Sequence, residues 1–216
     1  MKYPCLVVDH DDTVVNSTAT VHYPCFVEYV GKYFPDYHCT LEEYFLKNFD
    51  PGVVPFFRDE VGMSEQQMAH EQEYWNEYVR AHVPRAYPGI REILWKQKNS
   101  GGLLCVSSHS LKANILRDYR ENGLPEPDMV FGWDEPREER KPSPHALYRI
   151  MERFQLKPHQ LLMVDDLKPG YDMARAAGVP FAAAGWAVNI PKIETFMRKN
   201  CGLYFKTVPE LFAYLF

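Results

Sequence analysis

The sequence lacks the long apolar runs and the paired cysteines that mark several common protein classes. No apolar run approaches the roughly 20 residues of a membrane-spanning helix, and the amino-terminal stretch MKYPCLVVDHDD does not have the pattern of a signal peptide. The five cysteines are odd in number, are scattered along the chain and form no CxxC pair. We therefore expect no disulfide framework, no zinc site and no membrane partner, and we expect a reducing, cytoplasmic location.

An excess of positive charge is also missing. The chain has 24 lysines and arginines against 29 aspartates and glutamates, which gives a net charge of −5. A nucleic-acid-binding domain would normally present a basic face, so we expect no nucleic acid as a partner. Apolar residues make up 46% of the 216 residues, which is ordinary for a globular protein with one large domain, or with a core domain and a smaller insert.

Short apolar segments of strand length recur at five places and carry the prediction of the fold. They are continuous rather than alternating, which is typical of parallel strands that are buried on both faces. The five segments are CLVV (5–8), GLLCV (102–106), MVFG (129–132), LLMV (161–164) and VPFAAAG (179–185).

Helical segments with start or stop signals lie between these strands. Residues 88–99 begin with proline, residues 110–123 begin with a serine that we expect to cap the helix, and residues 143–154 begin with serine and then proline. A further helical segment, 168–178, ends at glycine. The repeated order of strand and helix predicts an α/β fold with a doubly wound, Rossmann-like parallel sheet.

Residues 16–87 interrupt this alternation. They contain amphipathic stretches separated by proline and glycine, and they carry eleven acidic and five basic side chains. We expect a helical domain at 16–87, inserted into an α/β core domain formed by 1–15 and 88–216. Eight aromatic residues at helical spacing should supply most of its core: Tyr23, Phe26, Tyr29, Tyr33, Phe34, Tyr44, Phe45 and Phe49.

Polar residues follow the predicted strands at the edge where parallel α/β sheets bind ligands. Because strand ends are neighbours in such a sheet, residues that are far apart in the sequence can converge there. The residues are Asp9 and Asp11 after the first strand, Ser107 after the second, Lys141 in the loop after the third, and Asp165 and Asp166 after the fourth.

Residues of these types could bind a phosphate group and react with it. Asp9 and Asp11 are two residues apart, so an extended backbone would point both carboxylates to one side, where they repel unless a cation or a shared proton relieves them. Taken alone, the two aspartates fit an acidic surface turn better. With the other acids they form an oxygen-rich site that suits Mg²⁺. Ser107 and Lys141 could hold phosphoryl oxygens, and a carboxylate could attack phosphorus to form an aspartyl-phosphate.

In this order, the motifs resemble those of the haloacid dehalogenase-like phosphohydrolases. The resemblance covers essentially the whole chain, since residues 16–87 lie where that family has an α-helical cap of the C1 type. Within the family it points to the phosphatase branch that includes phosphoglycolate phosphatase and β-phosphoglucomutase. The motifs are DHDDT at 9–13, Ser107 in LLCVSSH, Lys141 in RKPSPHAL, and Asp165 and Asp166 in VDDLKPGYDMARAAG.

The resemblance implies a Mg²⁺-dependent phosphoric monoester hydrolase that acts on a small phosphorylated metabolite, as a monomer or homodimer. It implies that Asp9 is the nucleophile and a metal ligand. It implies that Asp11 is the general acid and base, with its backbone carbonyl also reaching the metal. Ser107 and Lys141 would hold the phosphoryl group, with Ser108 as a competitor of Ser107. Asp166, helped by Asp165, would complete the metal site.

The chain departs from the family pattern at three nearby positions. Asp12 stands where the family usually has glycine, and aspartate tolerates a positive φ better than most residues. Asn16 replaces a common acid, and His10 replaces an apolar residue. The dehalogenases of the family lack the second aspartate, so Asp11 favours phosphate ester hydrolysis, where the leaving alcohol needs a proton.

Other functions compatible with the motifs are a sugar phosphomutase, a phospho-accepting signalling module and a catalytically inactive binding protein. Phospho-accepting receiver domains have their acidic pair first and lack an insert of this size. Two further residues are candidates for substrate binding, His109 after the second strand and Arg58 in the insert. For both, as for His10, a local hydrogen bond or ion pair is the commoner role.

Overall fold

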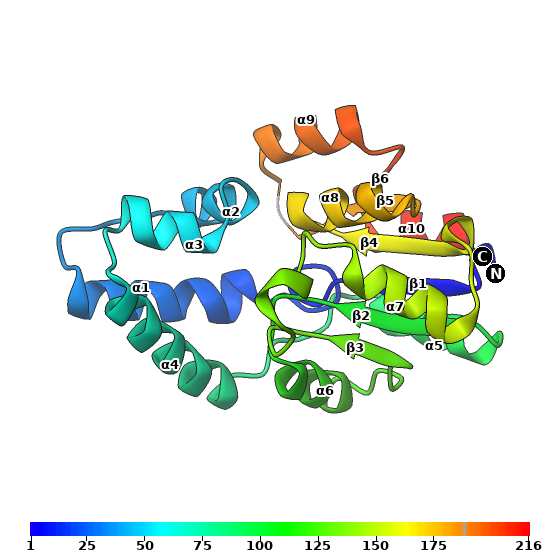
Figure 1. The fold of residues 1–216 in the computed structure, drawn as a ribbon, viewed down its shortest axis with the longest axis horizontal. Coiled ribbons are helices and arrows are strands. Elements are labelled where there is room, and N and C mark those ends of the chain that lie inside the picture. The colour runs from blue at the N-terminus through cyan, green and yellow to red at the C-terminus, as the bar shows by residue number, and fades with distance from the viewer. Residues whose placement is uncertain (188) are drawn as a thin grey trace. The chain divides into compact units, whose positions relative to one another are not determined.

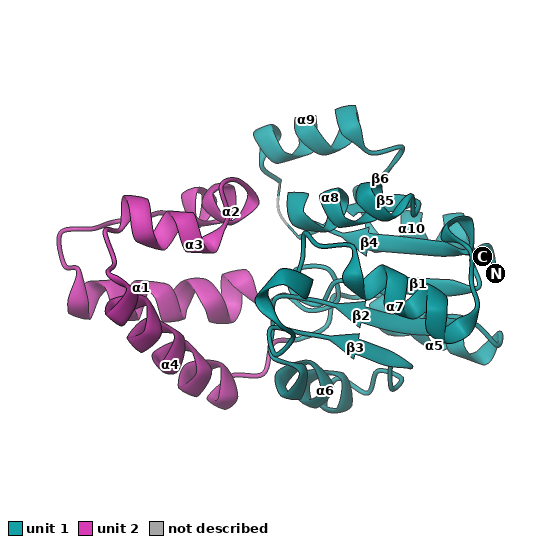
Figure 2. Ribbon diagram, in the orientation of Figure 1, with its two compact units in different colours: residues 1–16, 85–216 teal, residues 17–84 magenta. Residues whose placement is uncertain are grey.

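The computed structural model describes residues 1–187 and 189–216, and the chain divides into two compact units (Figures 1 and 2). The sheet unit consists of residues 1–16 and 85–216, and the helical unit consists of residues 17–84. The sequence predicted a core domain of 1–15 and 88–216 and an insert of 16–87. Among the described residues, no helix is both long enough and apolar enough to cross a lipid bilayer.

The sheet unit contains a sheet of six parallel strands in the order β3-β2-β1-β4-β5-β6. All five predicted strands are present, and the predicted α/β class is confirmed. A sixth strand was missed, and two of its three residues are only partly buried. The strands are β1 (Cys5–Val8), β2 (Leu103–Ser107), β3 (Met129–Phe131), β4 (Leu161–Asp165), β5 (Phe181–Ala184) and β6 (Leu203–Phe205).

Helices cover the sheet, which explains why its strands are continuously apolar. Leu6, Leu104 and Leu162 of the three central strands pack in one cluster with side chains of α5, α6 and α10. Helix α8 packs against β4 and β5. The helices of this unit are α5 (Ile90–Asn99), α6 (Lys112–Glu121), α7 (His145–Phe154), α8 (Lys168–Ala177), α9 (Pro191–Asn200) and α10 (Val208–Leu215), with single turns η3 (Arg137–Glu139) and η4 (Pro158–Gln160).

The predicted serine cap of α6 is wrong. The helix begins after Leu111, and its first backbone N–H, that of Lys112, donates to Asp134 Oδ2 at 2.6 Å. A carboxylate from a loop that is distant in the sequence thus accepts the hydrogen bond of the first helical N–H. The Ser110 hydroxyl instead donates to Asp11. Ser143 likewise does not cap α7, because Pro144 occupies the position before its first residue.

The helical unit is built around aromatic side chains. Phe26, Tyr44, Phe56 and Phe57 form its centre, with ring centroids 4.9–5.6 Å apart for the three partners of Phe26. Most of the predicted aromatic core is buried, but Tyr33 is 39% exposed. The helices are η1 (Thr18–His22), α1 (Tyr23–Tyr33), α2 (Leu41–Phe49), α3 (Val53–Pro55), η2 (Phe56–Glu60) and α4 (Glu65–Ala81).

Candidate active site

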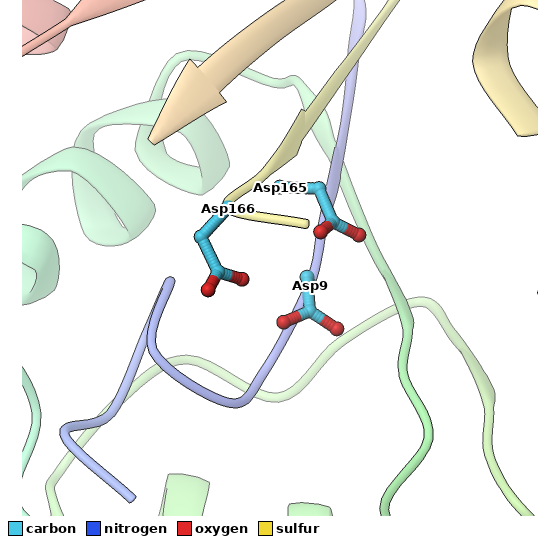
Figure 3. Close-up of side chains that lie close together, drawn as sticks. All are labelled: Asp9, Asp165 and Asp166. Carbon is cyan, nitrogen blue, oxygen red and sulfur yellow. The ribbon is translucent and has the colours of Figure 1, made fainter. Parts of the chain in front are cut away.

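Three carboxylates converge where β1 and β4 end. These strands are paired in parallel, with Val8 opposite Val164, and the Asp9 N–H continues the ladder by donating to the Val164 carbonyl at 2.9 Å. Asp165 is the last residue of β4 and Asp166 follows it. One carboxylate oxygen from each of Asp9, Asp165 and Asp166 lies within 4.8 Å of the other two (Figure 3). The sequence-predicted convergence of these strand ends is therefore present.

Lys141 ties two of these carboxylates together. Its ammonium donates to Asp9 Oδ1 at 2.6 Å and to Asp165 Oδ2 at 2.7 Å, and all three side chains are buried. Burial alone lowers the pKa of Lys141, but the charges of Asp165 and Asp9 outweigh burial and raise it. Lys141 is therefore a fixed positive charge beside Asp9.

Asp165 is held by the start of α8. Its Oδ1 accepts the Leu167 N–H at 2.8 Å, while its Oδ2 receives Lys141. Gly170 lies so close that a Cβ at this position would be 2.1 Å from Asp165 Oδ2. The absence of a side chain at residue 170 thus allows the carboxylate to occupy this place.

Asp166 lies beside the loop that follows β1. Its Oδ1 accepts the Thr13 hydroxyl at 3.4 Å. Burial raises the pKa of Asp166 well above its ordinary value, and the neighbouring charge with the largest effect is that of Asp12. Asp12 has φ = +58°, so this aspartate does adopt the left-handed conformation that the sequence suggested it could tolerate.

The three carboxylates have the composition of a site for a hard divalent cation. Asp9, Asp165 and Asp166 are 4%, 0% and 6% exposed, and buried carboxylates are costly unless they are paired or bind metal. Burial raises the pKa of Asp9 to about 7, with Asp165 and Asp11 adding to the rise and Lys141 opposing it. An all-oxygen donor set of three carboxylates, only partly neutralised by one lysine, fits a hard divalent cation such as Mg²⁺.

Asp11 is not one of these three carboxylates, and two serine hydroxyls hold one of its oxygens. Its Oδ2 accepts Ser110 Oγ at 2.6 Å and Ser108 Oγ at 3.2 Å, and the Ser110 N–H donates to Ser108 Oγ at 3.1 Å. Ser110 was missed as a site residue because it was interpreted as a helix cap. Its place in the run SSHS, directly after a buried strand, was the available signal.

In the sequence, Ser107 comes directly before Ser108, and His109 lies between Ser108 and Ser110. Ser107 ends β2 with its hydroxyl buried, 3.9 Å from the Met173 sulfur. His109 Nε2 donates to the Lys141 carbonyl at 3.1 Å, and burial lowers the pKa of His109 to about 4, so the imidazole is neutral at pH 7. His109 therefore supports the backbone of Lys141. The roles of Ser107, Ser108 and His109 toward a substrate stay predictions.

His10 and Arg58 have local partners. His10 is 1% exposed, with Nε2 3.0 Å from Asp118 Oδ2 and its ring stacked on Tyr119. It is thus part of the core of the sheet unit. Arg58, in the helical unit, donates to both oxygens of Asp59 at 2.7 and 2.8 Å. Its predicted contact with a substrate stays a prediction.

Comparison with known proteins identifies the family. Residues 6–184 match the haloacid dehalogenase-like hydrolases, a span that contains every motif residue described above. The chain belongs to this family. A phosphoglycolate phosphatase of Nitrosospira multiformis is 37% identical over 103 residues, which are 44% of this chain and 41% of that protein. The chain matches 41–62% of the length of such curated relatives.

Solved structures show that the family fold extends over the whole chain. A Bacteroides fragilis protein assigned to the haloacid dehalogenase-like hydrolases aligns with a TM-score of 0.82 and 19% identity, covering 97% of this chain and all of that one. CbbY from Rhodobacter sphaeroides, solved with phosphate, aligns with a TM-score of 0.72 and 18% identity over 97% of this chain and 96% of that one.

Proposed function

We propose that this haloacid dehalogenase-like protein is a Mg²⁺-dependent phosphatase that hydrolyses a small phosphorylated metabolite through an aspartyl-phosphate on Asp9. The observation that carries the proposal is the buried group in which Lys141 bonds Asp9 and Asp165 while Asp166 lies beside them. The names of the curated relatives support phosphatase activity and make 2-phosphoglycolate the first substrate to test.

Asp9 is the proposed nucleophile. Lys141 fixes Asp9 Oδ1, which leaves the other carboxylate oxygen to attack phosphorus. The P–O bond to the leaving alcohol breaks as the Asp9 O–P bond forms, and water then hydrolyses the acyl phosphate to release inorganic phosphate. Because a carboxylate and a phosphate repel each other, the positive charge of Lys141 beside the reacting oxygen lowers the barrier.

Asp11 is the proposed proton donor and acceptor. Ser108 and Ser110 donate to one of its oxygens and so restrict the carboxyl group. In the first step Asp11 gives a proton to the leaving alcohol, and in the second step it takes one from the attacking water.

Asp9 and Asp166, helped by Asp165, would hold the divalent cation. When bound, it would neutralise the buried carboxylates and offset the negative charge of the phosphoryl group.

The five unpaired cysteines among the described residues agree with the proposed cytoplasmic location, where thiols stay reduced.

A phosphate-release assay tests the proposal. Purified protein is incubated with 2-phosphoglycolate and with a panel of sugar phosphates, in Mg²⁺ and in EDTA. We expect inorganic phosphate from at least one ester, its loss in EDTA and its recovery on adding Mg²⁺. An isomerised sugar phosphate without phosphate release would identify a phosphomutase instead, and full activity in EDTA would remove the metal from the proposal.

A further inference from the structure

His10 stands between Asp9 and Asp11 in the chain, but its side chain takes its partner from helix α6. Its Nε2 donates to Asp118 Oδ2 at 3.0 Å. The carboxylates on either side of it receive hydrogen bonds from the loops after β2 and β3 instead. The three successive side chains therefore diverge, and the direction of His10 affects the directions of Asp9 and Asp11.

The ring of His10 has a single hydrogen bond, the one to Asp118. His10 and Asp118 are 1% and 2% exposed, and the other ring nitrogen, Nδ1, is buried without a hydrogen-bond partner among the described residues. Asp118 is itself fixed, because two guanidinium nitrogens of Arg117 lie 2.8 and 2.7 Å from its Oδ1. A buried hydrogen bond to a carboxylate that is fixed in this way restricts the histidine to one orientation.

The backbone of His10 closes the loop that contains both acids, residues 9–15. Its carbonyl accepts the N–H groups of Val14 and Val15, at 3.0 and 3.1 Å. Val15 in turn pairs with Ala86, and the Tyr87 N–H donates to the Val14 carbonyl at 3.0 Å. Loop 9–15 is thus held through His10 at its start and through the segment 86–87 at its end.

The end of α6 holds both of these places. Asn122, which follows the last residue of the helix, accepts the Ala86 N–H on its Oδ1 at 2.8 Å. Its side-chain amide donates to the Asp118 carbonyl at 2.8 Å. Asp118 and Asn122, about one helical turn apart, therefore anchor loop 9–15 at His10 and at Ala86.

We propose that Asp118 is a positioning residue which acts through His10 to set the directions of the Asp9 and Asp11 carboxylates, with Asn122 holding the other end of their loop. The inference rests on the proposed function and deepens it, because it concerns the same reaction. A displacement of about 1 Å caused far from the reacting atoms can cost about 10²-fold in rate. Ser107 and Lys141, the residues proposed to hold the phosphoryl group, lie outside this loop, so we expect a loss of turnover and not of substrate affinity.

Steady-state hydrolysis of 2-phosphoglycolate, or of the panel ester that releases most phosphate, tests the assignment. Asp118→Asn keeps the volume but removes the charge that holds His10. We expect kcat to fall about 10-fold, with KM within twofold of the wild type. His10→Leu should show the same loss. The double variant should be no slower than either single variant, because the two side chains act as one unit.

Asn122→Ala is a second variant that leaves the contact between Asp118 and His10 in place. It removes the acceptor of the Ala86 N–H and should lower kcat in the same way, again without raising KM. Asn122→Asp keeps an oxygen at this position and should retain more of the wild-type kcat than Asn122→Ala.

Asp128→Asn is the matched control for a loss of stability alone. Asp128 precedes β3, at the opposite end of the sheet, and bonds Lys98 at 2.7 Å and the Leu104 N–H at 2.8 Å. This variant should lower the unfolding temperature while kcat stays within twofold of the wild type. Circular dichroism gives the folded fraction to which each kcat is referred.

Hydrogen exchange of the peptide 9–16 gives a readout that does not depend on activity. The amides of Val14 and Val15 donate to the His10 carbonyl, so they should exchange faster in Asp118→Asn and at the wild-type rate in Asp128→Asn.

Two kinetic results would overturn the role of Asp118. One is a kcat of folded Asp118→Asn within twofold of the wild type, and the other is a double variant in which the losses of the two single variants multiply. A wild-type protein that released no phosphate from any ester would refute the proposed function, and unchanged exchange of peptide 9–16 in Asp118→Asn would still refute the anchoring of the loop by itself.

Discussion

The sheet unit and the helical unit both bury carboxylates, but they surround them differently. In the sheet unit, Asp9 and Asp165 share a lysine and lie among other acids at strand ends. In the helical unit, Glu71 of α4 is 8% exposed, and the charge of His22 only partly opposes the effect of its burial. Burial raises the pKa of Glu71 to about 7. The acids of the sheet unit are thus paired with a buried lysine, whereas Glu71 of the helical unit is buried with no such ion pair among its described contacts.

The two surroundings predict opposite results for the same chemical change, carboxylate to amide. At a strand end the change removes a reacting group and should lower activity. In the helical unit it removes an unfavourable charge and should raise stability. Three carboxylate-to-amide substitutions and the removal of Lys141 probe this difference.

Asp9→Asn should reduce phosphate release at least about 10³-fold, because an amide does not attack phosphorus. Circular dichroism should show that the fold is retained, and Asp36→Asn should keep wild-type activity. If Asp9→Asn kept a tenth of the activity, Asp9 would not be the nucleophile, and the contrast between the units would lose its main support.

Asp11→Asn should slow the first chemical step by about 10²–10⁴-fold for an alkyl phosphate, whose leaving group needs a proton. The loss should be smaller for p-nitrophenyl phosphate, whose leaving group departs without one. Single-turnover rates for the two esters give the measurement. Equal losses for both would leave Asp11 without the acid role, and Ser110→Ala should show a weaker form of the same pattern.

Lys141→Met should destabilise the metal-free protein by about 3–5 kcal/mol, since it leaves two buried carboxylates without their shared partner. Urea unfolding at pH 7 measures the change. Lys157→Met, at an exposed lysine of the same unit, is the control and should change stability by less than about 0.5 kcal/mol. A Lys141 variant as stable as this control would show that the cluster does not depend on its lysine.

Glu71→Gln should be more stable than the wild type at pH 8 by about 1–3 kcal/mol and similar to it at pH 5. The folded state keeps the Glu71 proton up to about pH 7, whereas the unfolded chain loses it near pH 4.3. The contribution of Glu71 to the free energy of unfolding is therefore complete at low pH, and it is lost as the pH rises from about 4.3 to about 7. Urea unfolding at both pH values measures it.

The matched control for this last prediction is Glu73→Gln, an exposed glutamate on the same helix. It should show no comparable gain at pH 8. A Glu71→Gln variant with the same stability difference from wild type at both pH values would mean that Glu71 is ionised throughout, and that the helical unit accommodates its charge as the sheet unit does.

Much of the sheet unit could be predicted because its signals are local. A buried parallel strand must be apolar at successive positions, so five of the six strands were visible as runs. The edge strand β6 was not, since two of its three residues are only partly buried and a buried apolar run is the signal that marks the other strands. The order of the motif residues along the chain similarly carried the family resemblance, and with it the expectation of an active site at the strand ends.

The sequence by itself determined which residues end the strands, where the chemistry-bearing acids fall, and that an aspartate replaces glycine at residue 12. Only the tertiary structure decided which partners these side chains take. Ser110 bonds Asp11 instead of capping α6, His10 turns into the core toward Asp118, and Lys141 bridges two acids from different strands. Hydrogen bonds and ion pairs reach only about 3–4 Å, so partners that are distant in sequence exist only once the chain has folded.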